Sequence, residues 1–174
     1  MRNKQQLKTK GPLLIAANHP NALMDAIIIG AMFKQQVHYL TRGDVFNQPW
    51  KRKLLGMLNM TPIYRISDGI ENLHLNQYAF DKSHEVLKAN GIVLIFIEGI
   101  CKHTHELQPF KKGAARIAFN CWKDGIDLKV MPISIRYHSL YCFGKHVLLN
   151  IASTKSKQEL SIADDDAKNY LHLD

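Results

Sequence analysis

The sequence predicts an α/β domain with a largely parallel or mixed sheet that helices cover on both faces. Short, continuous apolar runs of strand length, such as 13–17 and 92–97, indicate strands buried on both sides. Segments with a helical spacing of apolar residues alternate with these runs along the chain. The 174 residues, 46% of them hydrophobic, suffice for one core and are too few for two. We therefore expect a single domain over residues 1–174.

The chain is expected to open with a strand, a helix and a second strand. Residues 12–17 form an apolar run between Gly11 and a loop at 18–21, which predicts the first strand. A helix is expected over 22–33, with Asn21 as its N-cap. The next apolar run, 37–41, predicts the second strand.

The middle of the chain predicts two helices around a short strand. Residues 45–60 mix basic and apolar residues in a helix-like pattern, and 62–64 resemble a short strand. The longest helix is expected over 68–89, because Asp68 and Glu71 form a capping-box pattern and Asn90-Gly91 is a stop signal. Residues 92–97 are the clearest buried strand.

The last third predicts a loop, a helix and two strands. Residues 98–110 are polar and predict a loop, and a helix over 112–122 ends before Asp124-Gly125. Strands are expected at 128–135 and 146–151, so that the core of the domain covers about 11–151. The polar tail, 153–174, is expected to be a solvated edge with a short final helix.

The charge balance favours anionic partners. Lysine and arginine number 23 against 15 acidic residues, a net charge of +8, which suits phosphorylated substrates, lipid headgroups or nucleic acid. We do not expect nucleic-acid binding, because the cations are dispersed and no zinc-finger, basic-zipper or aromatic RNA-binding pattern occurs. The apolar runs are shorter than the roughly 20 residues of a membrane span, and no secretory signal precedes the first strand. Three widely spaced cysteines argue against a disulfide framework and favour the cytoplasm.

Residues 48–60 have the composition of a segment that binds a lipid surface. Trp50 is followed by three consecutive cations at 51–53 and by an apolar set of leucine and methionine residues. Cations of this kind interact with anionic headgroups, and tryptophan favours the interface. We expect peripheral attachment to a membrane; an ordinary amphipathic helix packed on the sheet is the alternative.

Polar clusters follow three of the predicted strands. Ligands of α/β sheets bind beyond the carboxyl ends of the strands, so these clusters predict a site. They are Asn18-His19 with Asp25, Tyr64-Arg65, and Glu98-Gly99. A histidine oriented by an aspartate acts as a general base near neutral pH. Because six positions separate His19 from Asp25, the two cannot share one face of a helix, and we place His19 in the loop. A capped helix start with a structural histidine is the alternative.

Four blocks occur in a characteristic order along the chain. They are Asn18-His19 with Asp25, Gly56 through Pro62-Ile63-Tyr64-Arg65, Phe96-Ile97-Glu98-Gly99, and Met131-Pro132-Ile133. Their order and approximate spacing resemble the motifs of the 1-acylglycerol-3-phosphate acyltransferase family. The resemblance extends over about 11–151 and implies the transfer of a fatty acyl group from acyl-CoA or acyl carrier protein to a hydroxyl of an anionic glycerophosphate or lysophospholipid. It implies no cofactor and no metal.

The resemblance also implies residue roles and a location. His19 matches the general base and Asp25 its partner, and Asn18 of the same block is expected to bind substrate. Arg65 matches the arginine that holds the acceptor phosphate, for which a guanidinium is well suited. Glu98 and Gly99 match the glutamate and glycine that shape the acceptor pocket. The expected location is cytoplasmic, peripheral to the inner face of the membrane.

The chain departs from the family pattern in two places. Five residues separate His19 from Asp25 where the family has four, and Ile100-Cys101 replaces a threonine and an arginine. Lys102, Lys111 or Lys112 are candidates to supply the missing charge. These departures keep two other functions open: a non-catalytic lipid-binding module and an acyl-thioester hydrolase.

The loop after Gly99 also carries the residues that most resemble a metal-binding cluster. Cys101, His103, His105 and Glu106 lie close in sequence, but structural zinc sites use four ligands with paired spacing. We predict a solvated lid loop without metal. Cys101 as an acyl-accepting nucleophile is a further alternative to an inert thiol.

Overall fold

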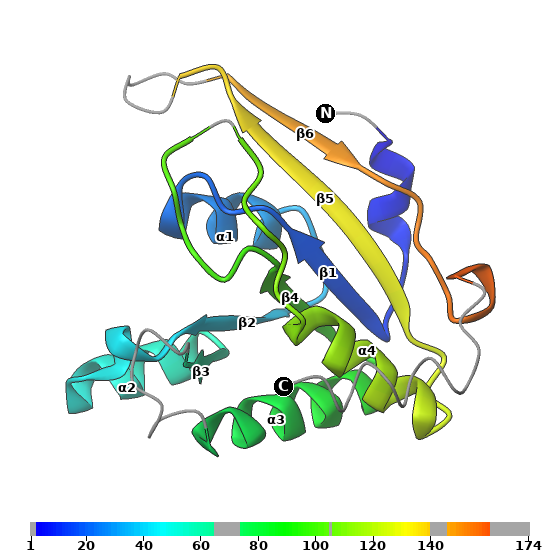
Figure 1. The fold of residues 1–174 in the computed structure, drawn as a ribbon, viewed down its shortest axis with the longest axis horizontal. Coiled ribbons are helices and arrows are strands. Elements are labelled where there is room, and N and C mark those ends of the chain that lie inside the picture. The colour runs from blue at the N-terminus through cyan, green and yellow to red at the C-terminus, as the bar shows by residue number, and fades with distance from the viewer. Residues whose placement is uncertain (1–2, 65–73, 105, 140–145, 161–174) are drawn as a thin grey trace.

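One mixed sheet organises the computed structural model, which describes residues 3–64, 74–104, 106–139 and 146–160. Its strands within these ranges are β1 (Leu13–Ala17), β2 (Val37–Arg42), β3 (Met60–Ile63), β4 (Ile92–Phe96), β5 (Lys129–Tyr137) and β6 (Val147–Ile151). They lie in the order β3-β2-β4-β1-β5-β6 (Figure 1). All neighbours pair in parallel except β5 and β6, which pair antiparallel. The predicted α/β fold class is confirmed.

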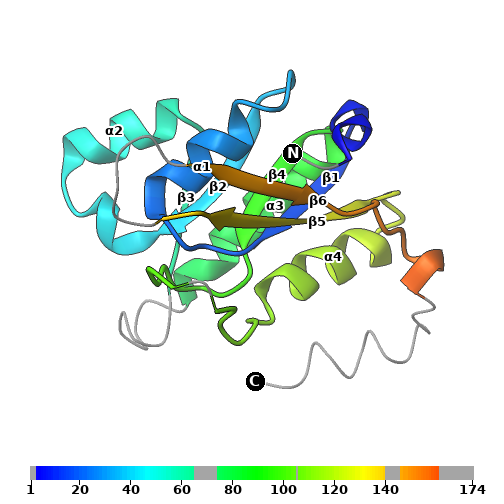
Figure 2. The same cartoon turned by 90° about the horizontal axis from the view of Figure 1, so that it is seen from above.

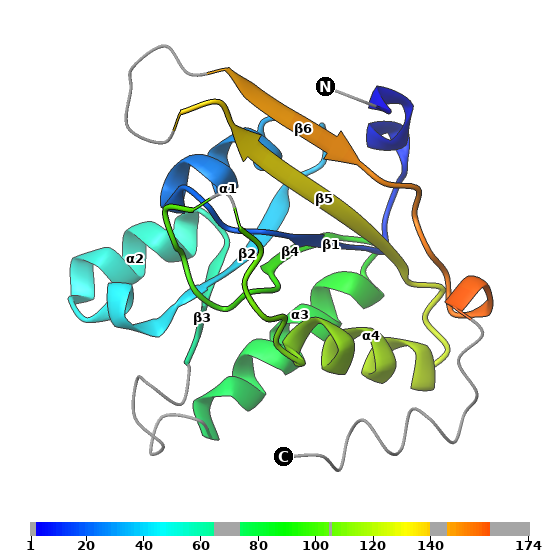
Figure 3. The same cartoon turned by 45° about the horizontal axis from the view of Figure 1, so that its top comes forward.

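Helices cover both faces of this sheet, as predicted. They are α1 (Ala22–Gly30), α2 (Pro49–Met57), α3 (Asn76–Lys88) and α4 (Gly113–Lys123), with short 3-10 helices η1 (Lys4–Lys8), η2 (Gly43–Phe46) and η5 (Gln158–Leu160). Figure 2 shows α1 and α4 on opposite sides of the sheet. Figure 3 shows α3 and α4 side by side, in line with the packing between them.

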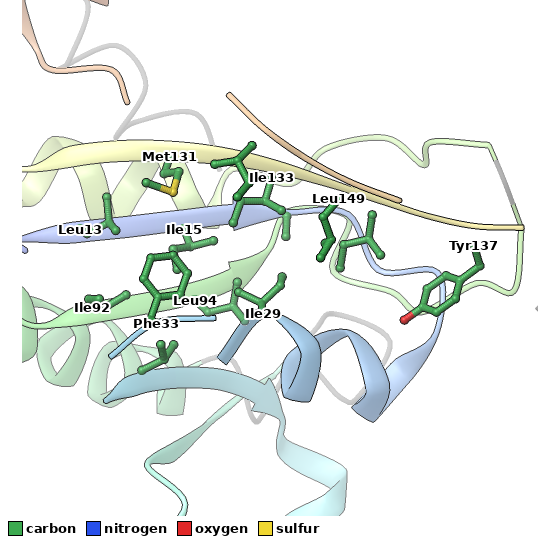
Figure 4. Packing of buried hydrophobic residues seen from close by; sticks show 14 residues of the cluster. Leu13, Ile15, Ile29, Phe33, Ile92, Leu94, Met131, Ile133, Tyr137 and Leu149 are labelled. Carbon is green, nitrogen blue, oxygen red and sulfur yellow. The ribbon is translucent and has the colours of Figure 1, made fainter. Parts of the chain in front are cut away.

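Two apolar clusters hold the layers together. On the α1 face, Ile29 and Phe33 pack against strand residues such as Ile15, Leu94 and Met131 (Figure 4). On the other face, side chains of α3 and α4 pack against strand residues of opposite pleat, among them Leu14, Val93 and Ile95. The most buried strands, β1 and β4, contribute to both clusters, which explains their continuous apolar runs.

The predicted helix over 45–60 is wrong in its extent. The chain forms η2 and then α2, and β3 begins at Met60. Gln48 is extended, with φ −116° and ψ 139°, and Pro49 starts the helix. A residue before proline avoids helical dihedrals and the proline ring has no N–H to donate, so one continuous helix cannot pass this point.

Other boundaries also differ from the prediction. Helix α1 ends at Gly30 rather than residue 33, because the next amides form tight turns that place Phe33 in the core. Strand β5 continues to Tyr137, two residues beyond the expected end. Helix α3 ends at Lys88, one residue before the expected end, and the expected start of that helix, with Asp68 and Glu71, lies outside the described residues.

The sheet order determines where a site can form. Strand β1 lies between β4 and β5, so the loop after β1 is flanked by the residues that follow both neighbours. Helix α1 returns over the face of the sheet directly after that loop (Figure 1). Among the described residues, no helix combines the length and apolar character that crossing a bilayer requires.

Candidate functional site

The loop between β1 and α1 brings His19 and Asp25 together. His19 lies two residues beyond β1, and Asp25 lies in the first turn of α1. The His19 Nδ1 atom is 3.0 Å from Asp25 Oδ2. The His19 ring stacks on Phe96, the last residue of β4, with centroids 3.7 Å apart and planes 16° apart. Within the described ranges no hydrogen bond reaches His19 Nε2, and the side chain is 17% exposed. Among the described residues, Nε2 is therefore the nitrogen of the His19 ring that has no hydrogen-bond partner.

Asp25 is fully buried and accepts three hydrogen bonds. Its Oδ2 atom accepts from His19 Nδ1 and, at 2.7 Å, from the Asn21 amide. Its Oδ1 atom accepts from the Tyr137 hydroxyl at 2.6 Å. Burying a carboxylate is costly unless donors replace the lost water, and these three donors do so.

The turn before α1 absorbs the extra residue of the His19–Asp25 spacing. Ala22 has a φ of 39°, a conformation that non-glycine residues seldom adopt. Asn21 lies at the N-cap position without a side-chain cap hydrogen bond. Instead its amide binds Asp25, and the Ala22 amide donates to the Cys101 sulfur at 3.1 Å. The five-residue spacing is thus compatible with a hydrogen-bonded His19–Asp25 pair.

Asn18 holds the start of this loop against β5. Its side-chain Nδ2 donates to the Ile135 carbonyl at 3.0 Å, and the Ile135 amide donates to Asn18 Oδ1 at 2.7 Å. The side-chain amide therefore imitates a peptide group and continues the β1–β5 pairing beyond Ala17. Because both its polar atoms are engaged with backbone, Asn18 supports the loop rather than facing outward.

The loop after β4 closes over the same place. Glu98 is 4% exposed, and its Oε1 accepts from the Gln108 amide at 3.3 Å. Gly99 has a φ of 62°, and a side chain there would meet Lys111. Burial is the main cause that raises the pKa of the Cys101 thiol, so the thiol stays protonated near neutral pH. A protonated thiol is a poor nucleophile, which favours an inert Cys101 over an acyl-accepting one.

Among the described residues, no hydrogen bond or ion pair joins His19 to predicted site residues other than Asp25. Arg65 lies outside the described residues. Its neighbour Tyr64 exchanges two hydrogen bonds with Asn76, near the edge strand β3. Lys102 is exposed on the loop, and Lys112 is exposed at the start of α4.

Metal-ligating side chains do not gather in the part of the chain that the structure describes: no group of three or more has metal-binding geometry there. In the sequence cluster of Cys101, His103, His105 and Glu106, His105 lies outside the described residues. The structure therefore adds no support for a metal ion.

Two features of the site are not among those predicted from the sequence: Tyr137, and the contact of Phe96 with His19. Strand alternation was the signal for Tyr137: residues 131, 133, 135 and 137 of β5 are buried on the face that α1 covers. Burial, the Asp25 hydrogen bond and the Asp25 charge raise the pKa of Tyr137 far above its usual value, so the hydroxyl remains a donor.

Comparison with known proteins identifies the family of the chain. A family model described as Acyltransferase matches residues 1–136, most of the chain. The chain belongs to the acyltransferase family. The sequence is also 28% identical over 117 residues to a protein of Bacillus subtilis (strain 168) described as a 1-acyl-sn-glycerol-3-phosphate acyltransferase. That match covers 67% of this chain and 54% of the relative, so the chain spans about half the length of the relative.

A solved structure shares the fold. The 1-acyl-sn-glycerophosphate acyltransferase PlsC of Thermotoga maritima superposes with a TM-score of 0.64 at 20% sequence identity. The match covers 99% of this chain and 67% of the other. The family resemblance inferred from the four sequence blocks is confirmed at the level of the acyltransferase family and its fold.

Proposed function

We propose that this chain transfers a fatty acyl group from a thioester, acyl-CoA or acyl carrier protein, to a hydroxyl of a glycerophosphate or lysophospholipid acceptor. The observation that carries the proposal is the pair of His19 and Asp25 at the end of β1, with Nδ1 and Oδ2 3.0 Å apart. Membership of the acyltransferase family supports it, and so does the similarity to the Bacillus subtilis protein described as a 1-acyl-sn-glycerol-3-phosphate acyltransferase.

In the proposed reaction, His19 Nε2 removes the proton of the acceptor hydroxyl as that oxygen attacks the thioester carbonyl carbon. Asp25 holds the opposite nitrogen and stabilises the imidazolium that forms. The carbon–sulfur bond then breaks, and the imidazolium returns the proton to the leaving thiolate. The reaction is balanced without a metal or another cofactor.

The acceptor's anionic group needs cations. By family resemblance Arg65 is proposed to hold it, with Lys102 and Lys112 as additional cations and Glu98-Gly99 shaping the pocket. A guanidinium offers two parallel donors to a phosphate, so Arg65→Ala is expected to raise KM for the acceptor more than it lowers kcat.

A thiol-release assay tests the proposed function. Purified protein is offered acyl-CoA or acyl carrier protein with a panel of glycerophosphate and lysophospholipid acceptors. His19→Ala is expected to lower the rate by roughly 10²–10⁴-fold, the usual contribution of a general base. His84→Ala is the matched control, because His84 Nε2 also lies 2.9 Å from an aspartate, Asp124, but on α3.

Each outcome selects one function. Thiol release that needs an acceptor, and that is lost in His19→Ala but not in His84→Ala, supports acyl transfer. Release that does not depend on the acceptor favours the hydrolase, and no release with any pair favours the lipid-binding module. Near-normal turnover by His19→Ala contradicts the mechanism.

We also propose that the chain docks peripherally on the inner, cytoplasmic face of a membrane. Exposed apolar side chains gather on α1, on α2 and on the loop after β4; we call them the apolar rim. They are Leu23, Met24, Ile27, Trp50, Leu54, Met57, Leu58, Ile100, Leu107 and Phe110. These elements lie at the end of the sheet to which β1 points, beside the His19 loop (Figure 1).

The charge of α2 favours an anionic lipid surface as the occupant of the rim. Lys51, Arg52 and Lys53 follow Trp50, and the Lys51 ammonium lies 5.7 Å from the Trp50 ring centre. Each cation near an anionic leaflet contributes about 1 kcal/mol, so replacing all three with glutamine is expected to weaken binding roughly 100-fold.

Vesicle sedimentation tests this docking. Binding to equimolar phosphatidylglycerol and phosphatidylcholine is compared with binding to phosphatidylcholine alone. The pair Trp50→Ala and Met57→Ala is expected to weaken binding. Leu148→Ala is the matched control, because Leu148 is an exposed apolar residue on the edge strand β6. Equal binding by all variants identifies α2 as an ordinary amphipathic helix.

A further inference from the structure

The Tyr137 hydroxyl is the third donor to the Asp25 carboxylate, and no family motif of the sequence includes it. We propose that Tyr137 is a positioning residue, which keeps the buried Asp25 ionised and turns its Oδ2 atom toward His19. This inference rests on the proposed function, because it assigns Tyr137 a role in the same His19–Asp25 pair.

Geometry is the first argument. The terminal torsion of an aspartate is soft, so one hydrogen bond does not fix the plane of its carboxylate. Here each oxygen has its own donors: Tyr137 binds Oδ1, while His19 and Asn21 bind Oδ2. Tyr137 ends β5, the longest of the described strands, and is 2% exposed, so its ring is held by the sheet. Figure 4 shows its hydroxyl oxygen turned toward α1, the helix that carries Asp25.

Electrostatics is the second argument. Asp25 has no exposed surface, and a buried charge persists only where hydrogen bonds replace its hydration. A donor stabilises the pair of neutral His19 and charged Asp25, which is negative overall, more than it stabilises the same pair after a proton has been added. Removing the Tyr137 hydroxyl therefore makes protonation of the pair easier. The titration midpoint of the pair then moves to higher pH.

Other charged and titratable groups face this cluster from the neighbouring elements. Cys101, on the loop after β4, interacts electrostatically with both Asp25 and Tyr137. Arg42 of β2 and Glu98 act in turn on Cys101. Burial raises the pKa of the Cys101 thiol, so its charge does not change where a histidine titrates. Tyr137→Phe leaves all of these groups in place.

The test compares Tyr137→Phe with the wild type by two readouts. The first is the NMR titration of the His19 ring, whose midpoint is expected to rise. The second is the pH profile of acyl transfer. Its acidic limb is expected to move to higher pH, with kcat roughly tenfold lower and KM for both substrates within about twofold. Tyr39→Phe is the matched control, because the Tyr39 hydroxyl also lies against α1, beside Gly30.

The two proposals fail in different ways. If the wild type transfers no acyl group, the proposed function fails, and the His19 titration still decides the role of Tyr137. If Tyr137→Phe titrates as the wild type does, or loses kcat without a shift of the acidic limb, Tyr137 is merely structural.

If Tyr137→Phe does not fold, the hydrogen bond is tested by replacing its acceptor, Asp25, and observing Tyr137. The NMR chemical shift of the Tyr137 Cζ atom, which carries the hydroxyl, is then compared between the wild type and Asp25→Asn at neutral pH. A change at Tyr137 with none at Tyr39 supports the proposal, and no change at Tyr137 overturns it.

Discussion

Asn18→Ala tests how the loop that carries His19 is held in place. The substitution removes two hydrogen bonds, of 3.0 and 2.7 Å, between the Asn18 side chain and the Ile135 backbone. A protein hydrogen bond contributes about 1 kcal/mol net, so the variant is expected to lose about 2 kcal/mol of unfolding free energy. For a chain of this size that loss lowers Tm by about 4–8 °C.

Thermal unfolding followed by circular dichroism measures this effect. Asn18→Asp keeps one acceptor but sets a second oxygen against the Ile135 carbonyl, so it is expected to be at least as destabilising as the alanine variant. Asn150→Ala, on the exposed side of β6, is the control and is expected to stay within about 0.5 kcal/mol of the wild type. An Asn18→Ala melting curve that matches the Asn150→Ala curve would refute the reasoning.

Two further predictions concern a glycine and a thiol. Gly99→Ala places a side chain at φ 62°, where a non-glycine residue costs about 1–2 kcal/mol. Gly56→Ala in exposed α2 is expected to stabilise the protein by up to about 1 kcal/mol. Urea unfolding measures both changes in unfolding free energy, and two changes of the same sign would contradict the conformational argument for Gly99. Burial raises the pKa of Cys121 from 9.0 to about 11, so the unfolded chain releases this proton first and stability falls as pH rises from about 9 to about 11. The urea midpoint is expected to fall less steeply with rising pH for Cys121→Ala than for the wild type. If the two proteins lose stability in parallel, the Cys121 thiol is not the cause.

Local sequence patterns predict the layers of this fold well. Strands β1 and β4 are short apolar runs because both their faces are buried, and such runs are visible without any knowledge of partners. The break at Pro49 is an equally local feature, but the helix-like spacing of residues 45–60 predicts one continuous helix there. The geometric restriction of the Gln48-Pro49 pair, rather than the apolar pattern, decides that position.

The site divides in the same way between local and distant information. The six-position separation places His19 in a loop and Asp25 in the first helical turn, as the structure has them. The contact of Tyr137 with Asp25 joins residues 112 positions apart and depends on where β5 ends. The peptide-like pairing of Asn18 depends equally on its neighbour strand, and no spacing near residue 18 indicates it.

The central place of β1 has a consequence for folding. This strand is made early, yet it pairs with β4 and β5, so that Leu13 meets Ile92 and Lys129. Contacts between distant parts of a chain form slowly, because a long loop must close before they stabilise anything. Both edges of β1 therefore stay unpaired during synthesis until β4 and β5, in the second half of the chain, have been made. Asp25 gains its hydrogen bond from Tyr137 only when Tyr137 has been added and β5 has joined the sheet.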